Sequence, residues 1–162
     1  MGEVIKTAKI SDCGRYRYQL TRYWGNGYFL PFVMLNPSTA DASNDDPTIR
    51  RCMEFARREG FGGIVVSNLC AWRSPSPDDL DKASDPIGPL NVDYLRGLAR
   101  AAAIAKAPIV CAWGVHGAGR GDVETRGLFV GEGARLVCLG KTAAGHPRHP
   151  LYVKGDTPLV PL

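Results

Sequence analysis

Four short apolar segments, separated by helical patterns, constrain the fold of this chain more than any other feature. They occupy residues 32–35, 64–66, 109–113 and 136–139. Each is too short for a helix and rich in apolar, often β-branched residues, which is typical of a buried strand. Strands that alternate with helices form right-handed βαβ units. The sequence therefore predicts an α/β fold: a three-layer α/β/α domain with a central, mainly parallel four-stranded sheet.

Three segments carry the pattern of amphipathic helices. Residues 46–60 begin with an Asp-Pro pair, which is typical of a helix start, and repeat apolar residues at i, i+3, i+4 and i+7. Residues 91–105 show the clearest apolar stripe, and residues 122–130 a weaker one because glycine interrupts it. The proline-rich segment 71–89 predicts a long loop with one turn at 77–82.

The N-terminal part predicts a β-hairpin. Residues 15–24 alternate between polar and aromatic or apolar side chains, and Gly-Asn-Gly separates them from a second apolar arm at 28–35. Pro31 places the start of this arm at a sheet edge. Residues 1–14 are expected to be poorly ordered or an edge segment.

The composition predicts one folded domain, residues 1–162. Of the 162 residues, 44% are hydrophobic and 22% are charged, as in an ordinary globular protein. No apolar run approaches the roughly 20 residues that cross a bilayer, and the first residues lack the apolar core of a signal peptide. We therefore expect a cytoplasmic protein without membrane contact. The net charge of +4 would suit an anionic partner, but it is also compatible with ordinary solubility.

The sequence predicts neither a cofactor nor a metal. The dinucleotide, phosphate-loop and hydrolase-elbow motifs are absent, and the five cysteines contain no CxxC pair. His116, His146 and His149 could be combined with Asp41 or Asp45 as metal ligands, but they lack the spacing of a known ligand motif.

Polar side chains follow each predicted strand at once. In parallel sheets ligands bind at the carboxyl ends of the strands, where loop amides and helix N-termini converge. The residues that follow the four strands are, in order, Asn36 to Thr39; Asn68 and then Arg73; Gly114 and His116; and His146, Arg148 and His149. Each also has a structural interpretation. Asn36 before proline suits a turn, Asn68 could tie a loop amide, and a histidine in a turn can lie at the surface. Trp113 can serve in packing.

Several segments resemble a bacterial and phage family catalogued only as a domain of unknown function, family 1643. The resemblance covers residues 15–153 and implies no established activity. The matching segments are FVMLNPSTAD, DDPTIRRC, GGIVVSNLCAWR, DPIGPLN, CAWGVHG and CLGKTAAGHPRHPLY.

Four segments also resemble, more distantly, motifs of the uracil-DNA glycosylase superfamily, which cuts the bond between a nucleobase and its sugar. Leu35-Asn36-Pro37 is similar to a motif whose asparagine positions the attacking water. Residues 63–68, followed by Arg73, are similar to a strand whose terminal asparagine reads the base edge. Residues 112–114 are similar to a strand ending in Trp-Gly, and residues 146–151 resemble a closing His-Pro-Ser loop.

The chain departs from these motifs in three places. One is that the phenylalanine which the family has some residues after the first motif, to stack on the base, is not evident. Ser38 and Thr39 follow Asn36-Pro37 where the family has glycine. Two His-Pro pairs, at His146 and His149, match the single family histidine, and neither is followed by serine. The leucine after the second pair favours His149.

The glycosylase resemblance implies a fold of that type and a nucleobase N-glycosylase acting on nucleic acid or a nucleotide. Asn36 would hold the attacking water, and His149 or His146 would stabilise the leaving base. The implied substrate-binding residues are Pro37, Ser38, Thr39, Asn68, Arg73, Trp113, Gly114, His116 and Arg148. Two alternatives are a binding module for a nucleotide or modified base, without catalysis, and a metal-dependent phosphoesterase.

Overall fold

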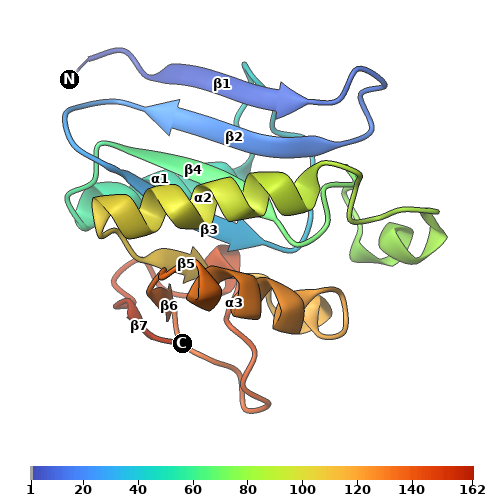
Figure 1. The fold of residues 1–162 in the computed structure, drawn as a ribbon. Helices are drawn as coiled ribbons and strands as arrows, with labels where there is room; N and C mark the ends of the chain where they lie inside the picture. Colours follow the sequence, from blue (N-terminus) through green and yellow to red (C-terminus); the bar gives the residue numbers. More distant parts are fainter. Residues whose placement is uncertain (1) are drawn as a thin grey trace.

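The apolar run at residues 32–35 forms the centre of the sheet. In the computed structural model, which describes residues 2–162, this run belongs to β3 (Phe29–Met34), whose side chains are buried from Leu30 to Met34. Seven strands form one sheet around it (Figure 1). In sheet order they are β1 (Ile5–Ile10), β2 (Arg17–Tyr23), β4 (Gly63–Asn68), β3, β5 (Ile109–Cys111), β6 (Leu136–Cys138) and β7 (Val160–Pro161).

The sheet is mixed. The four neighbours β4, β3, β5 and β6 run parallel to one another, and each forms within or overlaps one of the four apolar runs of the sequence. Antiparallel strands extend both edges, because β2 pairs with β4, β1 with β2, and β7 with β6. The predicted four-stranded sheet therefore has too few strands. It missed β1, whose sequence IKTAKI is mostly exposed, and β7, which has two residues.

The predicted hairpin between residues 15–24 and 28–35 is wrong. β2 pairs with β1 and β4, whereas β3 pairs with β4 and β5. A strand buried on both faces, as β3 is, gains most from a central position with neighbours on both sides. The residues before Phe32 still have a neighbour on one side only, because β5 pairs with β3 at Phe32 and Val33. Pro31 therefore costs no ladder hydrogen bond on the β5 side.

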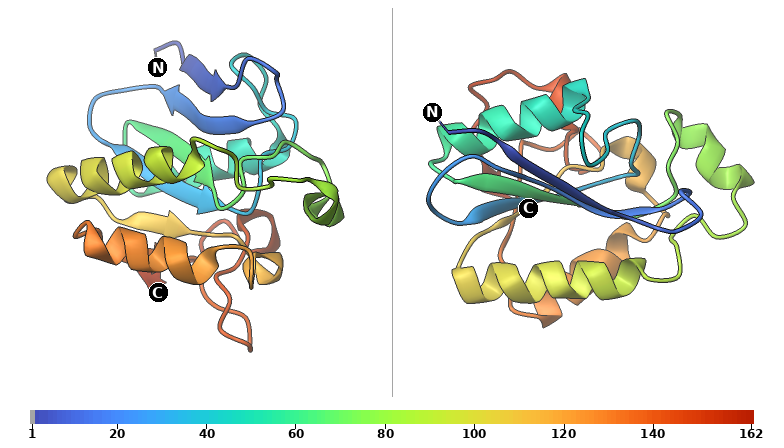
Figure 2. Two further views of the ribbon diagram at one scale, coloured as in Figure 1. Left: turned by 45° about the vertical axis from the view of Figure 1, so that its right-hand side comes forward. Right: turned by 90° about the horizontal axis from the view of Figure 1, so that it is seen from above.

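Helices cover both faces of the sheet (Figure 2). On one face lies α1 (Pro47–Arg58), with Asp46 as its N-cap, as predicted. On the other face lie α2 (Asn91–Ala105), at the predicted bounds, and α3 (Asp122–Gly131). Three short 3₁₀ helices occur in the loops: η1 (Pro77–Lys82), η2 (Val115–Gly117) and η3 (Pro150–Tyr152).

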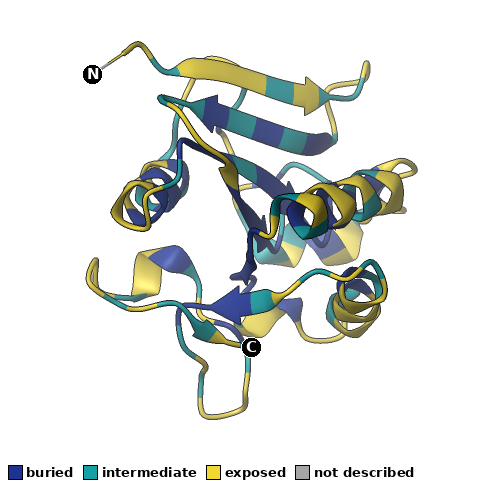
Figure 3. Ribbon diagram, turned by 60° about the vertical axis from the view of Figure 1, so that its left-hand side comes forward, coloured by how far each residue is buried: buried dark blue, intermediate teal, exposed yellow. Residues whose placement is uncertain are grey.

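Alternating side chains of the parallel strands supply two cores. Phe32 and Met34 pack toward α1, and Val33 packs toward α2 and α3. The burial colouring shows the central strands as the most buried part of the molecule (Figure 3). All five cysteines are free thiols, and Cys111 and Cys138 are buried. Among residues 2–162, no helix has the length and apolarity that a membrane span requires.

Candidate functional site

The site lies at the carboxyl ends of β3 and β5, two neighbouring strands after which the chain continues to opposite faces of the sheet. The chain leaving β3 leads to α1 on one face, and the chain leaving β5 leads to α3 on the other face. Adjacent parallel strands whose connections diverge leave a crevice at their carboxyl ends, which is the usual ligand position in open α/β sheets.

A cavity of about 370 Å³ occupies this crevice. It has the size of a small-molecule site. Eight of the residues predicted from the sequence line it, although they come from four separate strand ends. They are Asn36, Ser38, Asn68, Trp113, Gly114, His116, Arg148 and His149.

The remaining four predicted residues do not line this cavity. Pro37 is buried beside it. Thr39 and Arg73 line a neighbouring hollow, which shares Ser38 with the cavity. His146 lies in the loop before the site, where its backbone N–H donates to Thr142 Oγ1. Of the two histidines that matched one motif position, His149 is therefore the one in the cavity wall.

The amide of Asn36 has a defined orientation. Its Nδ2 faces three backbone carbonyl oxygens, those of Ser74 at 3.0 Å, Pro37 at 3.2 Å and Trp72 at 3.4 Å. Carbonyl oxygens only accept hydrogen bonds, so the NH₂ group must face them. No residue among 2–162 donates a hydrogen bond to Asn36 Oδ1. This oxygen is left to accept a hydrogen bond from a ligand or a water.

His149 also has a defined tautomer. It is half-buried, and its Nδ1 accepts a hydrogen bond of 3.2 Å from the backbone N–H of Leu151. Nδ1 therefore carries no proton, and in the neutral ring the proton sits on Nε2. Burial lowers the pKa of His149, and the nearby charge of Asp46 opposes this effect. The side chain is thus a neutral hydrogen-bond donor near pH 7.

Gly114 connects the end of β5 to the loop that carries His149. Its N–H donates to Pro147 O at 2.8 Å, and its φ of 70° and ψ of −169° lie in a region that glycine alone occupies readily. Arg148 extends this connection, because its N–H donates to Gly140 O after β6. Two strand ends therefore hold the histidine loop in place.

Asn68 lies at the inner end of the cavity beside an arginine that the sequence analysis did not single out. Asn68 is 1% exposed, and its Oδ1 is 3.5 Å from Nη2 of Arg17, which is itself 2% exposed. Arg17 lines the same cavity. It reaches this face of the sheet through a bulge in β2, where the pairing shifts between Lys9–Gln19 and Ile10–Arg17.

Other lining residues were missed for want of a signal. Ser74, Thr48, Thr142 and Tyr152 belong to loops or helix ends whose sequence resembles ordinary connecting segments. Asp46 was identified as a helix cap, and it does accept a hydrogen bond of 2.8 Å from Ile49 N. It also lines the cavity, so it contributes a carboxylate to the site.

The other two aspartates considered as metal ligands have different contacts. Asp45 forms an ion pair of 2.6 Å with the buried Arg22, and Asp41 accepts hydrogen bonds from the backbone of Ser43 and Asn44. Within residues 2–162, no group of three His, Cys, Asp or Glu side chains is arranged to hold a metal ion.

Two arginines of α1 hold the C-terminal segment. Arg51 donates to Pro150 O and Val153 O, and Arg58 donates to Gly155 O and Thr157 O. None of the α1 arginines lines the cavity.

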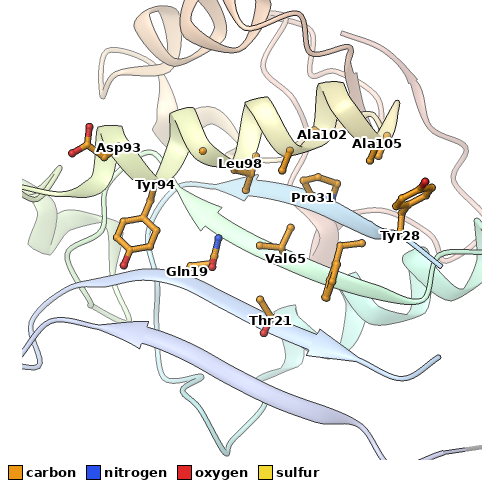
Figure 4. A pocket seen from close by; sticks show the side chains of 14 residues that line it. Gln19, Thr21, Tyr28, Pro31, Val65, Asp93, Tyr94, Leu98, Ala102 and Ala105 are labelled. Atoms are coloured by element: carbon orange, nitrogen blue, oxygen red, sulfur yellow. The ribbon is translucent and has the colours of Figure 1, made fainter. Parts of the chain in front are cut away.

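A larger groove of about 600 Å³ lies away from these groups, between α2 and the exposed part of the sheet (Figure 4). Its walls are mainly alanines and other apolar side chains, with Tyr28 and Tyr94 at its ends. It contains no histidine, arginine or asparagine. Its polar groups are those of Gln19, Thr21, Asp93 and the two tyrosines, whereas the oriented Asn36 and His149 lie in the smaller cavity.

A scan of protein-family models matches residues 17–151 to a family described as "Protein of unknown function (DUF1643)". The chain belongs to the DUF1643 family. The matched segment begins at Arg17 and ends at Leu151, so it contains every lining residue of the cavity except Tyr152. β1 and β7 lie outside it.

A search of curated proteins and a search of solved structures return no match. The likeness of this DUF1643 chain to the uracil-DNA glycosylase superfamily therefore rests on the sequence motifs alone.

Proposed function

We propose that this protein is a nucleobase N-glycosylase, which hydrolyses a base–sugar bond in nucleic acid or in a nucleotide. The observation that supports this most strongly is the pairing of two oriented groups in one cavity. Asn36 has a free amide oxygen, and His149 is a neutral Nε2–H donor.

The reaction requires a placed water and donors aimed at the departing base. The water oxygen bonds to the sugar carbon C1′, while the bond from C1′ to the base nitrogen breaks and its electron pair goes to the base. One water proton remains on the new sugar hydroxyl, and the other ends on the base. Positive charge builds on the sugar and negative charge on the base in the transition state, so oriented dipoles on each side lower the barrier.

Each role suits the geometry of the assigned residue. Asn36 Oδ1 can accept a hydrogen bond from the attacking water, because backbone carbonyls fix the other end of the amide. The Nε2–H of His149 can donate to the base as it becomes negative. Asp46 adds a negative charge in the same cavity, which favours the positive charge that builds on the sugar.

The nucleotide would bind against the remaining wall of the cavity, which consists of Ser38, Asn68, Trp113, Gly114, His116 and Arg148. Thr39 and Arg73 in the adjoining hollow would contact the flanking part of a longer nucleic acid, and Pro37 would support the loop. A flipped base in such a pocket is read by amide groups and held by stacking.

A binding module without catalysis would use the same contacts. The base-release experiment described below distinguishes such a module from a glycosylase. The phosphoesterase alternative gains no support, since the oxygens of Asp41 and Asp45 are engaged by backbone amides, Arg22 and Lys6.

The test is to incubate the protein with oligonucleotides and nucleotides that carry a panel of natural and modified bases, and to measure released base by mass spectrometry. Asn36→Ala should reduce release about a hundredfold or more, the usual effect of losing one preorganised polar group at a reacting centre. Asn26→Ala is the matched control, because Asn26 lies in the exposed loop before β3, away from the cavity. Binding of a panel member without any base release would favour the binding module, and full activity of Asn36→Ala would remove the role of that residue.

The two histidines provide a second test. His149→Asn should strongly reduce base release, because the shorter side chain withdraws the donor while its oxygen can still accept the Leu151 N–H. His146→Asn should leave release unchanged, since His146 does not line the cavity. The reverse result would assign the reaction to the other histidine and contradict the proposed geometry.

A further inference from the structure

Two arginines on β2 are buried in different ways. Arg22 is 0% exposed and Arg17 is 2% exposed, and both extend from the sheet toward the α1 side. Their surroundings differ in charge and in hydrogen bonding, and this difference points to a function of Arg17 that the glycosylase motifs do not include.

Arg22 is fully engaged. Its Nε donates to Asp45 at 2.6 Å, and its Nη atoms donate to the carbonyl oxygens of Thr7, Thr21, Asp41 and Asn44. A buried guanidinium with a carboxylate partner and satisfied N–H groups is a structural element that holds the segment before α1.

Arg17 lacks such partners. Its Nη1 donates to Ala40 O at 3.0 Å, and its Nη2 lies 3.5 Å from Asn68 Oδ1. Its Nε is buried without a hydrogen-bond partner, and no carboxylate within residues 2–162 forms an ion pair with it. Burial lowers the pKa of Arg17 to about 10, with the charge of Asp46 opposing this, so the side chain is still cationic near pH 7.

An unpaired buried cation is costly, and a protein that keeps one commonly uses it on a ligand. The neighbours of Arg17 agree with such a use. The Oδ1 of Asn68 faces Arg17, so its Nδ2 is turned elsewhere as a donor, and no residue among 2–162 accepts from it. Arg148 adds a second positive charge to the cavity wall.

We propose that Arg17 is an anion-binding residue, which receives a phosphate or carboxylate oxyanion of the ligand at the inner end of the cavity. Arg17 would donate through its guanidinium group, and Asn68 Nδ2 would donate beside it. This inference rests on the proposed function in one respect, which is that both place a ligand in this cavity. If the ligand is a nucleotide, the oxyanion is its phosphate.

The two arginines should differ in how their substitution changes the stability of the fold. Arg17→Met replaces an unpaired buried charge with an apolar chain of similar length, so the free protein should be as stable as the wild type or more stable. Arg22→Met leaves Asp45 without its buried partner and should be strongly destabilising, with a clear fall in melting temperature. Thermal unfolding of both variants measures this contrast.

The binding test uses inorganic phosphate, acetate, a nucleoside and its 5′-monophosphate as separate probes at constant ionic strength. Calorimetry should detect phosphate or acetate binding to the wild-type chain, and Arg17→Met should weaken it at least tenfold. Arg17→Lys, which keeps the charge but loses the planar fork, should bind less tightly than the wild type and retain the fold. Arg50→Met, an exposed arginine outside the cavity, controls for the change in net charge.

The probes also identify the source of the oxyanion. Tighter binding of phosphate and of the monophosphate over the nucleoside assigns it to a phosphate, and preference for acetate assigns it to a carboxylate. No binding of either anion, equal binding by wild type and both Arg17 variants, or a loss of stability in Arg17→Met as large as in Arg22→Met would each overturn the proposal. Base release with no anion binding would overturn this inference alone, whereas anion binding without base release would overturn the glycosylase proposal alone.

Discussion

At the scale of single residues, the protonation of His149 links the site to the stability of the fold. The folded chain holds this ring neutral, because burial lowers its pKa and Leu151 N–H occupies Nδ1. An unfolded chain would titrate near the ordinary value of about 6.5. The unfolded state therefore binds more protons between that value and the lower folded one, and stability falls as the pH drops through this window.

We predict that His149→Asn removes part of this acid sensitivity. Urea unfolding between about pH 7 and about pH 5 should show a smaller loss of unfolding free energy in the variant than in the wild type, and the two curves should run parallel above about pH 7. Substitution of the exposed His116 by Asn serves as the control. Identical curves for His149→Asn and the wild type would show that the ring titrates alike in both states.

Sequence reasoning located some residues of the site and missed others for a physical reason. Asn36 follows β3, Asn68 is the last residue of β4 and His149 lies in the loop after β6, so their convergence follows from a parallel sheet. Arg17 lies inside β2, and regular alternation gave no reason to place it in the cavity. A bulge reverses its direction, and bulges leave little trace in a sequence.

At the scale of elements, the connection between β5 and the histidine loop depends on one glycine. Gly114 adopts a backbone conformation that other residues reach at a cost of about 1–3 kcal/mol. A Cβ built there lies 3.8 Å from His149 Cβ, so the cost is conformational rather than a clash.

We predict that Gly114→Ala lowers the free energy of unfolding by about 1–3 kcal/mol and reduces base release by displacing the loop that carries His149. Gly97→Ala is the matched control, because Gly97 lies within α2 with no atom near its added Cβ. It should raise stability by up to about 1 kcal/mol. Chemical denaturation measures both, and a shift in the same direction for both variants would contradict the explanation.

The helices were easier to predict than the pairing of the strands. Asp46-Pro47 and the apolar spacing in α1 are local signals, and the same holds for the stripe of α2. The false hairpin arose because Gly-Asn-Gly signals a turn but not which strands pair. In the fold this turn packs against Gly62, where a Cβ would lie 2.7 Å from Asn26 O, and β4 then separates β2 from β3.

At the scale of the whole molecule, β1 protects the edge of the sheet. It carries Lys6 and Lys9 on an exposed strand, and its partner β2 would otherwise present unpaired backbone groups. Lys6 also pairs with Asp45, and Thr7 O accepts from Arg22.

We predict that deletion of residues 2–10 lowers the melting temperature and increases self-association relative to the full chain. Size-exclusion chromatography with light scattering, at matched concentration, measures the association. A truncated chain that elutes and melts as the full chain does would show that β1 does not protect the edge of β2.

The chains diverge after β3 and β5, so the residues that the fold requires are separate from the loop residues that can be substituted. The floor of the cavity consists of strand ends shared with two cores, whereas its walls are loops that follow four different strands and hydrogen-bond to one another. Substitutions in one wall can alter the shape and polarity offered to a ligand while the floor stays intact. Relatives built on this plan can therefore diverge in ligand choice through their loops, at little expense to folding.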